Sequence, residues 1–300
     1  MWIYLLSFDM KPVKFLFFIN RGSGLNNKPD ATDVIKTIML QHQISYKITE
    51  INEELDAKQI KSLIGKYNIE TVIAAGGDGT VNFIASSILG MNVNLGILPL
   101  GSANGLAYEL GIPLKIEDAV QTLLTGKSQP IDAVRVNNNI CLHLSDLGIN
   151  ARLIKSFEEE GKRGFLRYFK HFIKVLKTPR SFRCIIESEG KVYVHRALMT
   201  VIANAGGYRS GAVINPTGAK DDGRFEVIVI KHRRNWIVRN TVAAFTGNFH
   251  NQPNIETYEC SKVKILVHPR QELQVDGELL GKSEEVRAEI MKHALKVIVP

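Results

Sequence analysis

From residue 13 onward, short apolar stretches alternate with segments in which apolar residues recur at helical spacing. The apolar stretches are VKFLFFIN, SYKITEI, TVIAAGGD and NLGILPL, and a helical pattern follows each of them. This alternation predicts an α/β layer with a mostly parallel sheet. TVIAA and LGILPL are apolar without interruption, as expected of strands that are covered on both faces.

Near residue 130 the pattern changes to strand-like stretches that follow one another. They are IDAVRVN, CLHLSDLGI, FRCIIES, KVYVHRALMTVIAN, RFEVIVIKH, KVKILVH, ELQVDGEL and VRAEI. Glu-Gly and Asp-Gly turn signals separate or interrupt them, at residues 189–190, 222–223 and 276–277. This texture predicts an antiparallel β domain, with helical insertions at about 163–177 and 235–246.

The composition adds a basic balance, with 38 Lys and Arg against 30 Asp and Glu. The excess favours a phosphate-bearing ligand or an anionic lipid surface as partner, although solubility alone explains it equally well. The three cysteines, Cys141, Cys184 and Cys260, are far apart and lack metal-binding spacing, so we expect neither a disulfide framework nor a zinc site. This cysteine usage fits a protein of a reducing compartment.

The apolar opening of the chain is broken by charged residues and a proline, and no part of it approaches the ~20 residues of a membrane span. No basic region precedes its first apolar run, so we expect a cytoplasmic rather than a secreted protein. Either Met1 or Met10 could be the first residue.

Three strand ends of the first half carry glycine-rich loops: NRGSG at 20–24, GGDGT at 76–80 and GSANG at 101–105. Ligands of α/β folds bind beyond the carboxyl ends of the strands. Glycines let the backbone approach a ligand, and amides at a helix N-terminus bind anions. The expected ligand is therefore a phosphate.

The standard lysine-containing phosphate loop and the dinucleotide fingerprint are both absent from the sequence. A phosphate would then depend on amides, hydroxyls and a cation. Asp78 would repel phosphates unless Mg²⁺ or a water stands between them. The alternative interpretation is a plain tight turn in which Asp78 caps the next helix.

GGDGTVN followed by PLGSANGLA, with NRGSG upstream and VDGEL downstream, resembles the diacylglycerol kinase catalytic domain family, which includes sphingosine, ceramide and bacterial lipid kinases. The resemblance extends from about residue 13 to Pro300. It implies an α/β nucleotide-binding domain similar to NAD kinases and phosphofructokinases, over 13–130 and a returning last strand at about 292–300. The same resemblance implies an antiparallel β-sandwich over 131–291 that takes the lipid.

The activity that the resemblance implies is ATP- and Mg²⁺-dependent transfer of the γ-phosphate to a lipid hydroxyl, on diacylglycerol, a sphingoid base or another lipid. Its ATP contacts would fall on Asn20, Gly24, Thr49, Gly76, Gly77, Asp78, Gly79, Thr80, Val81, Asn82 and Ser102.

Similar bacterial lipid kinases bind a structural Mg²⁺ through the Asp of a D-G motif and two backbone carbonyls. The resemblance carries these ligands to the side chain of Asp222 and to the carbonyls of Ala219 and Arg224. An ordinary turn at this Asp-Gly is the alternative.

The acidic pair of VDGEL, Asp276 and Glu278, would lie near the transferred phosphate. The resemblance makes either of them the candidate base for the lipid hydroxyl, with Asp78 organising Mg²⁺ through water. Without the resemblance, a hairpin turn at residues 276–277 is favoured over a catalytic role.

The segment KRGFLRYFKHFIKVLK, residues 162–177, places apolar residues at helical spacing and basic residues between them. Such a helix suits an anionic membrane surface, so we expect a peripherally membrane-associated protein. A core-packing helix with a solvated basic face is the alternative. We expect a lipid substrate and no nucleic-acid partner, and a homodimer is left open.

The chain departs from the family at one site, because many bacterial members read N-D-F-A-R where this chain has Asn104, Gly105, Leu106, Ala107 and Tyr108. The N-G-[LM]-A form is closer to the sphingosine and ceramide branch, which leaves the substrate open. An NAD kinase-like enzyme and a non-catalytic lipid-binding regulator that retains the fold are the competing interpretations.

Overall fold

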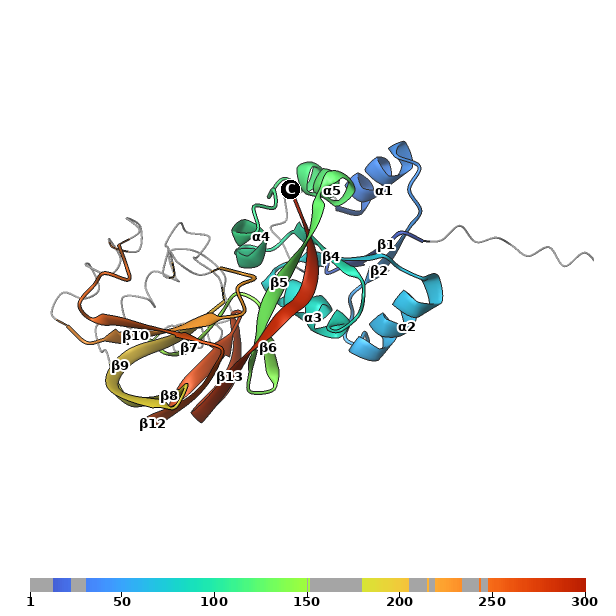
Figure 1. Ribbon diagram of the computed structural model, residues 1–300. Coiled ribbons are helices and arrows are strands. Elements are labelled where there is room, and N and C mark those ends of the chain that lie inside the picture. Colours follow the sequence, from blue (N-terminus) through green and yellow to red (C-terminus); the bar gives the residue numbers. More distant parts are fainter. Residues whose placement is uncertain are drawn as a thin grey trace, which may run out of the picture.

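The first part of the chain forms a four-stranded parallel sheet with helices on both faces (Figure 1). The computed structural model describes residues 13–22, 31–149, 151, 180–204, 215, 219–233, 243 and 248–300. The sheet has the order β4-β3-β1-β2. Its strands are β1 (Phe15–Ile19), β2 (Tyr46–Glu50), β3 (Thr71–Gly76) and β4 (Asn94–Pro99). The helices are α1 (Ala31–Gln41), α2 (Ala57–Tyr67), α3 (Asp78–Ile88), α4 (Gly105–Glu109) and α5 (Ile116–Thr125).

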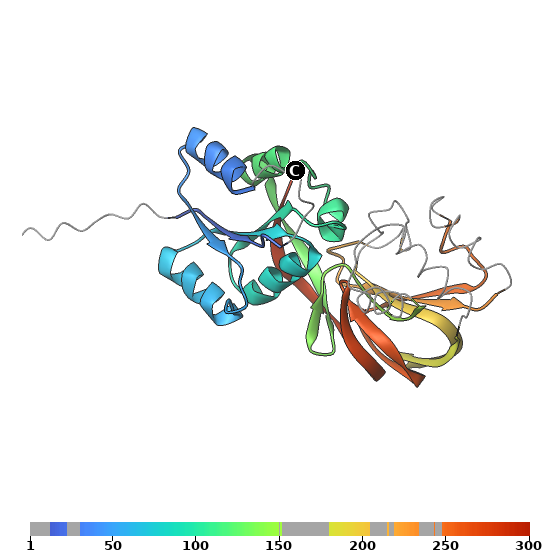
Figure 2. The ribbon, with the colours of Figure 1, turned by 180° about the vertical axis from the view of Figure 1, so that it is seen from behind.

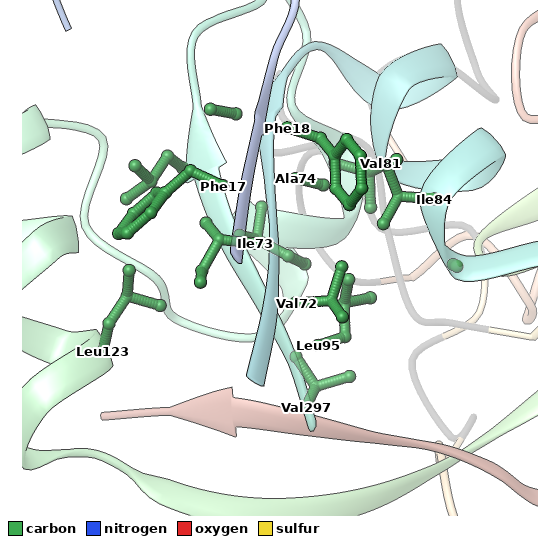
Figure 3. Packing of buried hydrophobic residues seen from close by; sticks show 14 of the residues in the cluster. Phe17, Phe18, Val72, Ile73, Ala74, Val81, Ile84, Leu95, Leu123 and Val297 are labelled. Atoms are coloured by element: carbon green, nitrogen blue, oxygen red, sulfur yellow. The ribbon is translucent and has the colours of Figure 1, made fainter. Parts of the chain in front are cut away.

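The central strands of this sheet are buried on both faces because their apolar residues are consecutive. α2 and α3 pack together on one face, and α1 and α5 on the other. Figure 3 shows Phe17 pointing toward Leu123 of α5, while Phe18 points toward Val81 and Ile84 of α3. Each fully buried side chain of this size contributes about 1.5–3 kcal/mol relative to an exposed one. Both helix layers therefore fix the sheet whose strand ends carry the glycine loops.

The second part is an antiparallel β-sandwich, in which two long strands change partners along their length. The half of β9 (Lys191–Ala203) that begins at Lys191 pairs with β8 (Phe182–Ser188), and its other half pairs with β7 (Leu144–Gly148) and β10 (Phe225–Lys231). β12 (Lys262–Val275) likewise pairs first with β8 and then with β7. Strands that switch partners in this way close two layers over one core. β11 (Ile255–Cys260) adds to β10. The predicted fold class, α/β followed by a β-sandwich, is confirmed.

One strand belongs to both parts of the molecule. β13 (Glu278–Val299) pairs with β12, then along β5 (Lys127–Val136), and finally in parallel with β4. Figure 2 shows β5 and β13 side by side, running from the sandwich to the first sheet. β6 (Asn139–Cys141) completes this region by pairing with β5. β5 runs without interruption through residue 130, so no loop separates the two parts there.

Several strands differ from the pattern that the sequence predicts. KVKILVH and ELQVDGEL are not two separate strands. The first stretch and the first half of the second, ELQV, belong to β12, in which a register shift between Leu266 and Gln271 interrupts the apolar alternation without ending the strand. The other half, DGEL, forms the turn at residues 276–277 and the start of β13. β11 is missed altogether, because only its terminal residues, Ile255 and Cys260, are buried. The predicted insertions at 163–177 and 235–246 lie outside the described residues, apart from Ala243.

Candidate active site

Asn20 at the carboxyl end of β1 ties the first glycine loop to the second. Its backbone N–H donates to the carbonyl of Ala75 at 3.0 Å, and its side-chain amide donates to Oγ1 of Thr80 at 3.2 Å. The amide of Gly22 in turn donates to Oδ1 of Asn20 at 3.0 Å. Asn20 therefore lies at the N-terminal turn of α3, whereas Gly24 lies outside the described residues.

The GGDGT and GSANG loops contact each other through glycine backbones. A Cβ on Gly101 would lie 2.4 Å from Cα of Gly77, closer than any real Cβ contact. The amide of Leu100 donates to the carbonyl of Gly76 at 2.9 Å. Asn104 closes the second loop, because its Oδ1 accepts from the amide of Gly101 and its Nδ2 donates to the carbonyl of Gly101, both at 2.9 Å. The sequence pattern alone does not predict this role of Asn104.

Asp78 is the first residue of α3, and its carboxylate points to the start of another helix. Oδ1 of Asp78 is 3.7 Å from the position that a Cβ on Gly105 would occupy, so the carboxylate lies close to the backbone amides of Gly105 and Leu106, which begin α4. No side-chain cap is present at the N-terminus of α3, where Gly77 is the N-cap. The alternative interpretation, in which Asp78 caps its own helix, is therefore wrong. Burial raises the pKa of Asp78, and the two amides and nearby His143 oppose that rise.

Thr80 and Asn82, which follow Asp78 in α3, contact the first sheet and the second part of the molecule, respectively. Thr80 is buried against Gly76, where a Cβ would lie 2.3 Å from Oγ1 of Thr80. Asn82 crosses to the other part of the molecule. Its Nδ2 donates to Oδ2 of Asp276 and to the carbonyl of Ile140, both at 2.8 Å.

Asp276 anchors the turn between β12 and β13. Its φ of 47° is left-handed, and Gly277 follows with a φ of 91°. The amides of Leu142, His143 and Leu144 donate to its carboxylate at 2.7, 3.0 and 3.0 Å, in addition to Asn82. A carboxylate that accepts this many hydrogen bonds is a positioning group, so the geometry favours Glu278 over Asp276 as the base.

Glu278 lies beside the second glycine loop. It is the first residue of β13 and is exposed. Its Oε1 is 3.2 Å from the position that a Cβ on Gly79 would occupy. The structure therefore brings the distal acid of VDGEL to the N-terminal turn of α3, where amides and the helix dipole favour an anion.

A cavity of about 160 Å³ opens between the two parts of the molecule at this place. Its wall includes Asp78, Asn82 and Asp276, and much of the remaining wall is apolar, contributed by Val81, Ala103, Leu106, Leu142 and Leu144. Acidic groups and an apolar wall in one cavity suit a ligand with a polar end and an apolar body.

Among the predicted ATP contacts, Asp78, Val81 and Asn82 line this cavity, whereas the other described ones, including Thr49 and Ser102, do not. Thr49 lies in β2, the outer strand of the sheet, opposite Phe18 in the register. Ser102 is exposed in the loop after β4. Both lie at the carboxyl ends of parallel strands, as predicted, and their contacts with a nucleotide stay predictions.

The proposed structural metal loop, Ala219 to Arg224, forms a turn that is held to the rest of the sandwich. Oδ1 of Asp222 accepts from the amide of Arg224 at 2.9 Å, and the amide of Gly223 donates to Oδ2 of Asp132 at 2.7 Å. One carboxylate and two carbonyls are the oxygen donors that Mg²⁺ prefers. The described residues include no cluster of three or more His, Cys, Asp or Glu that could hold a metal, so this site stays a prediction.

Several polar residues are buried behind the site, and the sequence patterns do not predict them. Asp132 is fully buried and also accepts from the amide of His293 at 2.7 Å. Gln274 accepts from the amide of Gly277 at 2.7 Å and donates to buried Asp146. In the sequence, each of these residues is a polar position next to apolar residues of a strand. A polar side chain in such a position requires a hydrogen-bond partner when it is buried.

The glycine loops, the distal acids and the two-part fold define a lipid-kinase-like protein. Residues 14–136 match the diacylglycerol kinase catalytic domain, and residues 146–299 match the YegS C-terminal NAD kinase beta sandwich-like domain. The chain belongs to the family that combines these two domains, which confirms the resemblance seen in the motifs.

Individual relatives agree over nearly the whole chain. The "Probable lipid kinase YegS-like" of Klebsiella pneumoniae is 28% identical, with 96% of each chain covered. The "Probable lipid kinase YegS" of Salmonella paratyphi A is 27% identical over 94% of this chain and 95% of its own. A solved structure titled "A putative diacylglycerol kinase from Bacillus anthracis str. Sterne" superposes with a TM-score of 0.79 at 23% identity, covering 97% of this chain and 98% of that one. That structural likeness shows the shared fold.

Proposed function

We propose that the protein transfers the γ-phosphate of ATP, with Mg²⁺, to the hydroxyl of a lipid. The observation that carries this proposal is the position of Glu278. Its carboxylate lies at Gly79 of the phosphate-facing loop, and the chain neighbours of these two residues, Asp78 and Gly277, line the cavity between the two parts of the molecule. The names of the relatives, probable lipid kinases, support the same class of acceptor.

The residues of the site would have separate roles in phosphoryl transfer. Amides at the N-terminal turn of α3 would bind the phosphates of ATP, as helix N-termini do. Asp78 would hold Mg²⁺ through water, and the metal would neutralise charge on the transferred group. Glu278 would accept the proton of the lipid hydroxyl, and Asp276 would hold Asn82 and the residue 142–144 backbone in place.

We infer that the protein works at a membrane surface from the cytoplasmic side. Among the described residues, no helix is long and apolar enough to span a bilayer. We propose peripheral attachment through the segment 162–177, in whose sequence basic residues alternate with apolar ones and whose structure lies outside the described residues. The net charge of +8 supports contact with an anionic surface.

The test is a phosphorylation assay with labelled ATP and Mg²⁺ on mixed micelles of diacylglycerol, sphingoid base, ceramide or polyprenol, with NAD as a separate acceptor. We expect one lipid, and not NAD, to be labelled. Glu278→Gln should lower kcat by about 10²- to 10⁴-fold, because it removes a general base, and leave the KM for ATP nearly unchanged.

The matched control is Glu54→Gln, which changes an exposed glutamate and should keep full activity. Asp78→Asn should abolish turnover while the circular dichroism spectrum stays that of the folded protein. An active Glu278→Gln variant would exclude this residue as the base. A wild-type protein that labels none of the lipids would contradict the proposed function itself.

A further inference from the structure

His143 borders the same point of the cavity as Asp78. A Cβ on Gly105 would lie 3.4 Å from Cδ2 and 3.5 Å from Nε2 of His143, and 3.7 Å from Oδ1 of Asp78. The imidazole therefore lies in contact distance of the space that a side chain at position 105 would take. Many bacterial members of the family carry an aspartate there, so this chain lines the cavity with an imidazole beside a glycine.

The backbone of His143 is fixed on both sides. Its amide donates to Oδ1 of Asp276 at 3.0 Å, and its carbonyl accepts from the amide of Asn204 at 3.0 Å. Asn204 is itself buried and donates from its side chain to the carbonyls of Asp132 and Leu142. The ring therefore projects from a rigid segment, as a residue that selects a ligand should.

The size and wall of the cavity limit what His143 could contact. The volume of the cavity, about 160 Å³, is roughly half of the ~300 Å³ at the lower end of the range for small-molecule sites. The cavity therefore suits the head group of a lipid rather than a whole lipid. Ionised carboxylates only accept hydrogen bonds, whereas an imidazole also donates. The side-chain amides of Asn82 and Gln274 in the same wall already donate to groups of the protein. Among the remaining side chains of the wall, His143 is therefore suited to a carbonyl oxygen of the ligand.

We propose that His143 is a specificity-determining residue of the lipid kinase proposed above, and that it donates a hydrogen bond to an acyl carbonyl next to the phosphorylated hydroxyl. The preferred acceptor class is then a lipid with an ester or amide group beside its hydroxyl, rather than a plain long-chain alcohol or a sphingoid base. The proposal rests on the proposed function, and it adds the chemical group that the site selects.

Three variants separate hydrogen bonding from shape. His143→Phe keeps a ring without a donor, His143→Gln keeps a donor, and His42→Gln changes an exposed histidine in the first domain as the matched control. Dioctanoylglycerol and dodecanol serve as the lipid with and the lipid without the carbonyl. The measurements are kcat and KM for each lipid, the KM for ATP, and calorimetric binding of dioctanoylglycerol without ATP.

We expect His143→Phe to lower kcat/KM for dioctanoylglycerol about tenfold, mainly through KM, and to leave dodecanol and the KM for ATP unchanged. His143→Gln should restore most of the loss. Equal losses for the two lipids, or no loss, would overturn the proposal. If the wild type phosphorylates neither of these two lipids, the binding measurement decides on His143: weaker binding in His143→Phe alone supports the proposal, and unchanged or absent binding overturns it. The proposed function itself fails only if no lipid of the full panel is labelled.

Discussion

At the scale of single residues, the site depends on backbone contacts that only glycine permits. Gly77 and Gly101 come from loops after different strands, and their close contact sets the distance between the phosphate-facing turn and α4. α4 in turn begins at Gly105, beside the carboxylate of Asp78. A change in that distance would therefore move the carboxylate on which the metal is proposed to depend.

Gly101→Ala should reduce kcat/KM about 100-fold, because its methyl group would lie 2.4 Å from Cα of Gly77 and the loops would have to separate. Gly65→Ala is the matched control, since no atom lies within 4 Å of the added Cβ in α2. That control should stabilise the protein by about 0.5–1 kcal/mol. Activity assays and thermal melts of both variants check the prediction, which an active Gly101→Ala protein would contradict.

The sequence predicts the identity of these loops but not the task of each side chain. Glycines at strand ends can be recognised in the sequence because their effect on the backbone is local. The roles of Asp78 and Asp276 are not local. The carboxylate of Asp78 lies beside Gly105 at the start of α4, and that of Asp276 accepts from the amides of residues 142–144, more than a hundred positions away. Only the folded chain distinguishes Asp276 from Glu278.

At the scale of elements, α2 shows how local sequence defines a helix. Asp56 is its N-cap, and its Oδ1 accepts from the amide of Gln59 at 2.7 Å. The amide of Asp56 donates to Oε1 of Gln59 at 3.1 Å, which completes a capping box. Buried Ile60 and Ile64 then place the helix against the sheet.

Asp56→Ala should lower the free energy of unfolding by about 1 kcal/mol, because it leaves the first turn of α2 without its cap. Urea denaturation measures this change. Glu53→Ala, an exposed acid three residues earlier, should change the stability by less than about 0.5 kcal/mol. Equal stability of the two variants would show that the cap does not stabilise this helix.

A second element-scale contact joins β9 to β11 through His195 and Tyr258. Nε2 of His195 lies 2.7 Å from the hydroxyl of Tyr258, with Glu256 and Lys231 beside them. Burial lowers the pKa of His195 below 6.5, Glu256 opposes the shift, and Lys231 adds to it. The unfolded chain therefore binds a proton near pH 6.5 that the folded protein takes up only at lower pH.

This shift makes stability fall as the pH drops from about 6.5 toward and through the lowered pKa of His195. His195→Gln should reduce the loss of unfolding free energy between pH 7 and pH 5, measured by urea titration at each pH. The pKa of Glu256 is lowered from 4.5, chiefly by its hydrogen bond with Lys231, so its own contribution is lost below this window. An equally steep slope in His195→Gln would contradict the prediction.

At the scale of the whole molecule, β13 connects two parts whose sequence patterns differ. The first part alternates strands with helices, and the second consists of successive strands. The apolar stretches VRAEI and LKVIVP are visible in the sequence, but their continuity is not, because the exposed residues between them interrupt the pattern. Pairing with β5 on one side, and with β12 and then β4 on the other, is what keeps the strand continuous. Parallel pairing of residues 296–297 with β4 joins positions about two hundred residues apart, which no local pattern encodes.

Because β13 is shared, a lesion in its last residues should weaken both parts together. Val297 is fully buried between β4 and β5, so Val297→Ala should cost about 2 kcal/mol through lost burial and the cavity that remains. Hydrogen exchange followed by mass spectrometry should show faster exchange in peptides from β3 and also in those from β12. Val192→Ala, the same substitution at a valine that is 62% exposed on β9, should leave both unchanged. Faster exchange confined to β3 and β4 would show instead that the two parts unfold independently, and that the shared strand does not couple them.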